Sequence, residues 1–130
     1  MLLFALFLAA ASAQPADDNA APVPGEWAWL NIPGVEGPGA RFSYETAIRR
    51  DGSRLGIRMR YDAADSRHPD RTVPVEALLT LDCAARTYQL LERGRPGSTR
   101  RVSHTAATPI GANSREWTLA YLLCPRAALP

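Results

Sequence analysis

The stretch RFSYETAIRRDGSRLGIRMRYD, residues 41–62, decides the fold because it holds two alternating segments joined by a turn signal. Apolar and polar residues alternate on both sides of Asp51-Gly52, which is typical of two strands that each bury one face. An Asp-Gly pair favours a two-residue type I′ turn, so we expect an antiparallel hairpin. In this register the apolar face consists of the cross-strand pairs Ile48 with Leu55, Thr46 with Ile57, Tyr44 with Met59, and Phe42 with Tyr61.

The other face of this hairpin is rich in arginine. The same register places Glu45 opposite Arg58 and Arg41 opposite Asp62, and each such pair contributes about 0.2–1 kcal/mol. A bulge within ETA, residues 45–47, would alter the inner pairs. The remaining arginines have no acidic residue opposite them and form our candidate binding patch, which consists of Arg49, Arg50, Arg54 and Arg60.

The segments on either side of the hairpin predict further strands. EWAWLNI, residues 26–32, forms a short strand with Trp27 and Trp29 on one side. VPVEALLTLDC, residues 73–83, predicts a buried strand, and RTYQLLE, residues 86–92, predicts its antiparallel return, in which Leu81 faces Tyr88 and Leu79 faces Leu90. RGRPGSTRR, residues 93–101, is expected to be a turn, and VSHTA, residues 102–106, a short edge strand.

The last segment, TPIGANSREWTLAYLLC at residues 108–124, predicts a C-terminal helix. Asn113 and Glu116 have the spacing of a capping box, and Pro125 would end the helix. Helical periodicity is carried by Trp117, Ala120, Tyr121 and Cys124. Because the leucines between them make the helix apolar almost all round, we expect it to lie deeply against the sheet.

Length and composition indicate a single globular domain. The chain has 130 residues, of which 46% are hydrophobic, and its formal net charge is +2. All fifteen basic residues are arginine, a bias that a GC-rich genome explains without any special guanidinium chemistry. Such a small net charge argues against nucleic acid as a partner, because binding to phosphates needs a strong basic excess.

The N-terminal segment MLLFALFLAAASAQ predicts a secretory signal peptide. Its apolar run precedes a small-x-small pattern, which places cleavage between Ala13 and Gln14. The run is shorter than the roughly 20 residues of a membrane span, so we expect no stable span after cleavage. The organisation predicted is a signal peptide at 1–13, a leader at 14–25, a domain at 26–125 and a tail at 126–130, in a protein that is periplasmic, secreted or on the cell surface.

Cys83 and Cys124 are the two cysteines of the chain. An even pair in an exported protein indicates a disulfide, since the compartments outside the cytosol are oxidising. The alternative is a catalytic cysteine paired with His68 or His104, but neither cysteine has basic neighbours that would lower the pKa of a thiol. The two histidines are also too few for a zinc site, and Ser66, His68 and Asp70 are too close in sequence to form a triad.

The order of these segments resembles the bacterial surface-adhesin protein E-like family over residues 26–125. The resemblance lies in the tryptophan strand, in FSYETAIRRDGSRLGIRMRYD, in LDCAARTYQLL with its Asp-Cys and spaced Arg and Tyr, in TPI, and in the helix SREWTLAYLLC. The chain departs from the family in PIGANS, where a second proline is common, and at Met59, where tryptophan is frequent. The resemblance implies an exported domain with an antiparallel sheet, a packed helix and this disulfide, and its founding member is an adhesin with reported heme binding.

Together these observations predict an α+β fold in which a sheet of about five to six antiparallel strands is covered by the C-terminal helix. We expect a non-enzymatic binding domain of the bacterial envelope with an adhesin-like role, whose partner is a protein of the envelope or of a host matrix. The alternatives are a periplasmic assembly or stress factor and a hydrolase with an unrecognised site. The residues themselves predict no cofactor or metal, and heme rests on the resemblance alone.

Overall fold

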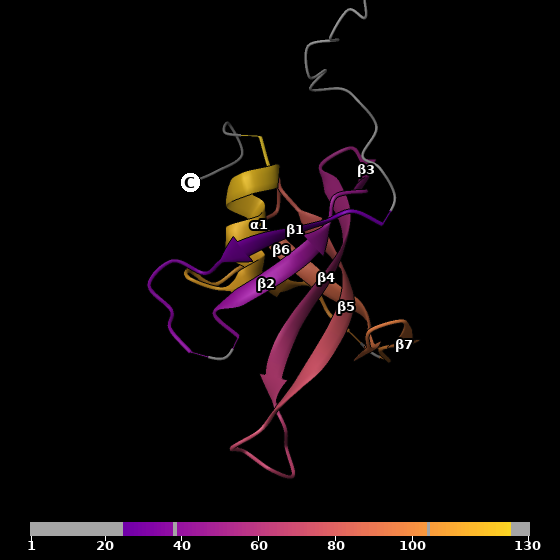
Figure 1. The fold of residues 1–130 in the computed structure, drawn as a ribbon. Helices are drawn as coiled ribbons and strands as arrows, with labels where there is room; N and C mark the ends of the chain where they lie inside the picture. The colour runs from indigo at the N-terminus through magenta and orange to yellow at the C-terminus, as the bar shows by residue number, and fades with distance from the viewer. Residues whose placement is uncertain (1–24, 38, 104, 126–130) are drawn as a thin grey trace, which may run out of the picture.

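The computed structural model describes residues 25–37, 39–103 and 105–125. These residues form eight antiparallel strands and one helix (Figure 1). The segments predicted as signal peptide and leader, up to residue 24, lie outside the described residues, as do His104 and the predicted tail from residue 126. The elements are β1 (Trp27–Asn31), β2 (Arg41–Glu45), β3 (Arg49–Asp51), β4 (Arg54–Ala64), β5 (Thr72–Asp82), β6 (Thr87–Arg95), β7 (Ser98–Arg101), β8 (Thr108–Pro109) and α1 (Arg115–Leu123).

The strands form one sheet in the order β1-β2-β4-β5-β6-β7, with β3 also paired to β4 and β8 also paired to β6. The predicted combination of an antiparallel sheet, a C-terminal helix and a Cys83–Cys124 disulfide is confirmed. The predicted number of strands is too small. The additional strands are short ones that share a neighbour with another strand. β2 and β3 pair with different parts of β4, and β7 and β8 pair with different parts of β6.

The hairpin register is correct at its open end and wrong near its turn. Phe42 pairs with Tyr61 and Tyr44 with Met59, as predicted. Closer to the turn, however, Arg50 takes the place opposite Leu55 that the sequence assigned to Ile48. The predicted pairing of Thr46 with Ile57 fails for the same reason.

Two local features explain this difference. The turn residues are Gly52 and Ser53 rather than Asp51 and Gly52, and of these two Gly52 alone has a positive φ, 59°, as a type II′ turn requires. Residues 46–48 leave the ladder between β2 and β3 as a bulge, which absorbs the shift. Ile48 still packs against the core from this bulge.

The central strands follow the prediction, whereas the predicted edge strand does not. Leu79 pairs with Leu90 and Leu81 with Tyr88. The strand that pairs with β6 at this edge is β7, not residues 102–106. The chain already reverses at residues 96 and 97, so most of the segment predicted to be a long turn belongs to β6 and β7. This reversal is tight, since a Cβ on Gly94 would lie 2.5 Å from the carbonyl oxygen of Ser98.

The hydrophobic core lies between one face of the sheet and α1 (Figure 1). The largest fully buried side chains are Phe42, Leu55, Ile57, Met59, Leu79, Leu81 and Leu119. The helix turns Leu119, Ala120 and Cys124 toward the sheet, whereas Tyr121 is 65% exposed. The predicted helical face is therefore correct for Ala120 and Cys124 and wrong for Tyr121, which stacks on Trp117 at 5.5 Å on the solvent side. A single helix on an open sheet buries one stripe, however apolar its remaining residues are.

The helix begins one residue later than the capping-box spacing suggested. Asn113 has a φ of 58°, whereas Ser114 has the extended backbone of an N-cap. The Ser114 hydroxyl accepts a hydrogen bond from the Trp117 amide at 3.0 Å and donates one to the Gly111 carbonyl at 2.7 Å.

Replacing Ser114 by alanine is expected to lower the free energy of unfolding by about 1 kcal/mol, because the Trp117 amide loses its acceptor. Urea titration followed by tryptophan fluorescence measures this change. Ser66→Ala, in the exposed loop between β4 and β5, is the matched control. Equal stability of the two variants would contradict the assignment of the cap.

Candidate functional site

One face of the sheet carries α1, and the other, which we call the outer face, has no helix over it among the described residues (Figure 1). Alternation along β4 determines which side chains lie there. Leu55, Ile57 and Met59 are buried in the core, so Arg58 and Arg60 belong to the outer face. This face is the candidate site because it collects charged and aromatic side chains from several strands.

A buried carboxylate lies at the centre of the outer face. Glu76 of β5 is only 3% exposed and accepts hydrogen bonds from Arg60 Nε at 2.8 Å and from an Arg58 guanidinium nitrogen at 3.1 Å. Arg58 also approaches a Glu45 oxygen at 3.9 Å. We call these four residues the Glu76 cluster.

The electrostatics of the cluster fix Glu76 in its ionised form. Burial raises the pKa of the Glu76 carboxyl, but the hydrogen bonds and charges of Arg60 and Arg58 outweigh burial, so the pKa lies below its ordinary value. A general acid working near neutral pH needs the opposite shift. We therefore assign Glu76 a positioning role, in which it holds two guanidinium groups in place.

Both tryptophans of β1 are stacked by arginines on this face. The Arg60 guanidinium lies 4.0 Å from the Trp27 ring centre, and that of Arg41 lies 4.3 Å from the Trp29 ring centre. Ser43 stands between Trp29 and Arg60 in the register, and its small side chain leaves room for Arg60 to reach β1. Trp29 remains 59% exposed, so part of its ring is available to a partner.

Two open hollows of about 400 Å³ each flank the Glu76 cluster. The first, which we call the arginine groove, combines charged side chains with small and apolar ones. Its lining includes Glu45, Arg49, Arg54, Gly56, Arg58 and Leu78. The second is lined by Trp27, Trp29, Arg41, Arg60, Pro74 and Pro96. Arg58 therefore faces the arginine groove and Arg60 faces the second hollow. Glu76 accepts hydrogen bonds from both guanidinium groups and so fixes their positions.

The structure separates the four arginines of the candidate patch. Arg49 and Arg54 both line the arginine groove, whereas Arg60 belongs to the Glu76 cluster. Arg50 lies opposite Leu55, so strand alternation turns it away from the outer face.

The expected charge partners of these arginines also change. Arg49 pairs with Gly56, and Arg54, for which no acidic residue was expected opposite in the hairpin, pairs with Asp51 across the turn. Arg54 also lies 3.7 Å from an Asp82 oxygen. Hydrogen bonds from the Ala85 amide, the Ser53 hydroxyl and the Ala84 amide, together with the Arg54 charge, hold the Asp82 pKa below its ordinary value despite desolvation.

Two further ion-pair expectations have different outcomes. The pair between Glu45 and Arg58 is confirmed, at a long distance of 3.9 Å. Within the described residues, Arg41 forms no ion pair with Asp62 and lies over Trp29 instead. The idea that Arg60 lacks an acidic partner is wrong, because Glu76 comes from β5, outside the hairpin from which the register was built.

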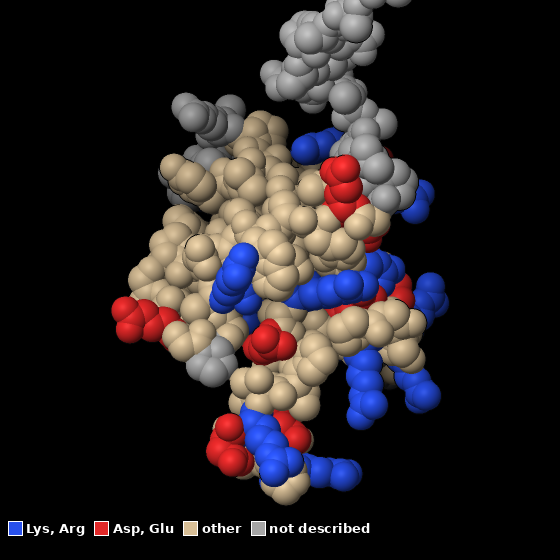
Figure 2. Space-filling model, in the orientation of Figure 1, with Lys and Arg blue, Asp and Glu red and all other residues tan. Residues whose placement is uncertain are grey.

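Glu76 is the residue of this candidate site that the sequence alone did not single out. Its signal was present, since a glutamate inside the otherwise apolar segment VPVEALL needs charged partners if that strand is buried. Opposite charges also meet across this face in Figure 2, where blue and red side chains lie next to one another near the middle of the view. The outer face is therefore a mixed-charge surface rather than a basic stripe.

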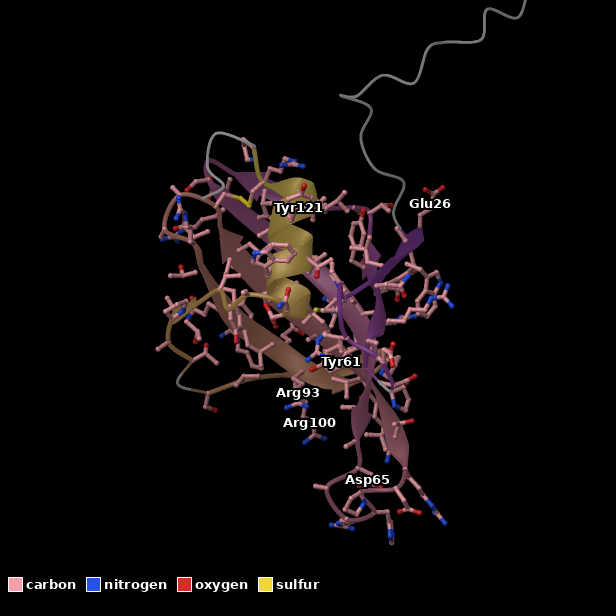
Figure 3. All side chains as sticks on the ribbon, turned by 90° about the vertical axis from the view of Figure 1, so that its left-hand side faces the viewer. Glu26, Tyr61, Asp65, Arg93, Arg100 and Tyr121 are labelled. Atoms are coloured by element: carbon pink, nitrogen blue, oxygen red, sulfur yellow. A yellow bond between two sulfur atoms is a disulfide. The ribbon has the colours of Figure 1, made fainter. Side chains whose placement is uncertain are left out.

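Other candidate chemistry is placed apart from this face. The loop with Ser66, His68 and Asp70 lies at the tip of the two-stranded arm of β4 and β5, which Asp65 marks in Figure 3. No group of three or more His, Cys, Asp or Glu within the described residues could hold a metal ion. No helix in this part of the chain is long and apolar enough to cross a membrane.

Fold and site together define a disulfide-linked α+β domain with one face covered by a helix and the other occupied by an ordered Arg, Trp and Glu surface. Comparisons of this chain with protein-family models, with curated proteins and with solved structures found no match.

Proposed function

We propose that this chain is an exported, non-enzymatic binding domain of the bacterial cell envelope, with an adhesin-like role, and that it contacts a protein partner through the outer face of its sheet. The signal-peptide pattern supports export, and the disulfide is consistent with an oxidising compartment. The resemblance to the surface-adhesin E-like family supports a role at the envelope.

The observation that carries this proposal is the buried Glu76, which orders Arg58 and Arg60, with Arg60 stacked on Trp27, on the sheet face that carries no helix within the described residues. Arginine and tryptophan are the residues that most often dominate protein interfaces. A long arginine side chain that is already fixed loses less conformational entropy when a partner binds. A buried ion cluster is also costly to build for stability alone, which favours a role in recognition.

A binding experiment with matched variants tests the proposal. The full chain, exported from a bacterial host and purified, is immobilised and exposed to envelope extract or to purified host-matrix proteins. Trp29→Ala and the double variant Arg49→Glu/Arg54→Glu are expected to weaken capture of the specific partner by about tenfold or more. The control is Arg67→Glu/Arg71→Glu at the tip of the arm, which makes the same charge change in exposed loop residues.

The outcomes separate the competing functions. Binding to host-matrix proteins that is lost in the Trp29 and groove variants supports the adhesin-like role. Binding only to envelope components supports an assembly or stress factor in its place. Equal capture by the wild type, the outer-face variants and the control variant would refute this face as the binding surface.

A further inference from the structure

A second cluster of arginines lies on the opposite side of the molecule, at the N-terminal end of α1. A hollow of about 460 Å³ lies there, lined by Tyr61 of β4, by Arg93 of β6, and by Ser114 and Arg115 at the start of the helix. Figure 3 shows Arg93 and Arg100 next to each other below α1, close to Tyr61. None of these arginines belongs to the Glu76 cluster or to the arginine groove, so the inference below does not rest on the function proposed for the outer face.

Arg93 and Arg100 are directly opposite each other in the β6–β7 pair, and both are exposed. Like charges in this position oppose strand pairing. Within the described residues, neither guanidinium forms an ion pair. The fold thus holds two positive charges together without a counterion from the described part of the chain, and a bound anion would relieve their repulsion.

Arg115 brings a third guanidinium group to this place. Its Cζ lies 3.7 Å from the centre of the Tyr61 ring, and this stacking fixes the direction of the side chain. Its Nε is buried and has no hydrogen-bond partner. The first turn of a helix also favours negative charge, because its free amides and its dipole point outward there. The terminal nitrogens of Arg115 and the free amides of the first helical turn add hydrogen-bond donors to the positive charges of Arg93 and Arg100, whereas the shielded Nε does not take part.

Acidic side chains, namely Asp62 and Glu116, also line the hollow. Their two negative charges are outnumbered by the three positive charges of Arg93, Arg100 and Arg115, so the surroundings still favour an anion. A phosphate monoester carries between one and two negative charges near neutral pH, and its oxygens match the bidentate geometry of arginine.

A larger apolar hollow of about 710 Å³ adjoins this one and shares Arg93 with it. It arises because β5 extends past the end of its pairing with β6, which begins only at Glu76 and Gly94. Val73, Val75 and Pro96 give it an apolar lining, and Val73 is exposed. An apolar hollow joined to an anion-binding one has the chemistry required by an amphiphile.

We propose that Arg93, Arg100 and Arg115 bind the phosphate-ester head of an amphiphile whose alkyl chain occupies the Val73 hollow. The ligand is a single molecule held in these hollows rather than an intact membrane surface. Arg115 and the helix N-terminus supply hydrogen bonds to the head, and Arg93 and Arg100 supply charge. The polar and apolar hollows together account for recognition of both ends of the molecule.

Calorimetric titration of the full chain tests this proposal with dodecyl phosphate, butyl phosphate and inorganic phosphate, all below micelle-forming concentrations. Dodecyl phosphate is expected to bind at least about tenfold more tightly than butyl phosphate, because its longer chain buries more apolar surface. Arg93→Gln and Arg115→Gln are each expected to weaken binding by about tenfold through loss of charged hydrogen bonds. Val73→Asp should reduce the affinity for dodecyl phosphate to that for butyl phosphate.

The controls distinguish this site from general adsorption. Arg67→Gln at the tip of the arm should bind as the wild type does. Dodecyltrimethylammonium should not bind, and equal binding of this cation would overturn the proposal. Unchanged affinity in Arg93→Gln would also overturn it, and this exposed strand residue gives a clear result even if Arg115→Gln loosens the helix. Binding to phosphatidylglycerol vesicles without binding to dodecyl phosphate would refute the single-molecule site and indicate a membrane surface contact.

Discussion

Replacing Cys83 and Cys124 together by alanine is expected to lower the free energy of unfolding by about 4 kcal/mol. The disulfide joins the end of β5 to the end of α1 across a sequence separation of 41 residues, and a loop of this size strongly restricts the unfolded chain. Both cysteines are also buried, so the loss of their packing adds to the cost. Total stabilities of domains are about 5–15 kcal/mol, so the variant should be only marginally folded.

Denaturant titration followed by tryptophan fluorescence measures this loss, with far-UV circular dichroism to show whether α1 remains formed. The wild-type chain unfolded in the presence of a thiol reductant is the matched control, since it loses the same covalent link without any substitution. A decrease of less than about 1 kcal/mol in both cases would mean that the link adds little beyond the packing of α1.

Replacing Glu76 by glutamine is expected to cost about 2 kcal/mol, because two guanidinium groups lose the carboxylate between them. Arg58 and Arg60 are 29% and 42% exposed and can regain some water, so the cost stays below that of a fully buried pair. The same substitution should weaken the stacking of Arg60 on Trp27 and shift the tryptophan emission.

The effect of Glu76→Gln should depend on pH. Because the pKa of Glu76 is lower in the folded protein than its ordinary value of 4.5, its stabilising contribution is fully present above pH 4.5. It is lost as the pH falls through the folded value. The wild type and the variant should therefore differ at pH 6 and converge in stability in acid, as measured by thermal unfolding across this pH range.

Glu36→Gln, in the exposed loop between β1 and β2, is the control for removal of one carboxylate. It should have a stability close to that of the wild type at pH 6. A constant difference between wild type and Glu76→Gln at all pH values would contradict the assignment of an ionised, arginine-bound Glu76.

Local sequence patterns were sufficient to predict most of the fold. Alternation in residues 41–45 and 54–62 placed Tyr44 and Met59 in the core, because strand side chains point to opposite faces whatever the partner strand is. The Cys83–Cys124 disulfide also follows from the sequence, since a pair of cysteines behind a predicted signal peptide indicates a disulfide. Failures occurred where a single residue decides the local geometry, at the Gly52 turn and at the Ser114 cap.

The candidate binding surfaces are harder to predict, because their residues come from strands that are distant in the sequence. Arg60 could be assigned to a face from the hairpin alone, but not to a partner, since Glu76 reaches it only through the register of β5 against β4. The Arg93 and Arg100 pair is hidden in the same way, because the sequence of residues 93–101 predicts one long turn, whereas the structure forms two paired strands there.

The sequence by itself determined which residues alternate between core and solvent, which cysteines join, and where the helix lies along the chain. These properties depend on short-range periodicity and on the strong cost of exposing apolar surface. The tertiary structure alone decided which charges meet. Burial specifies only the face of the sheet on which a side chain lies. The partner of a charged group depends on strand order, turn position and bulges, which are fixed by packing of the whole domain.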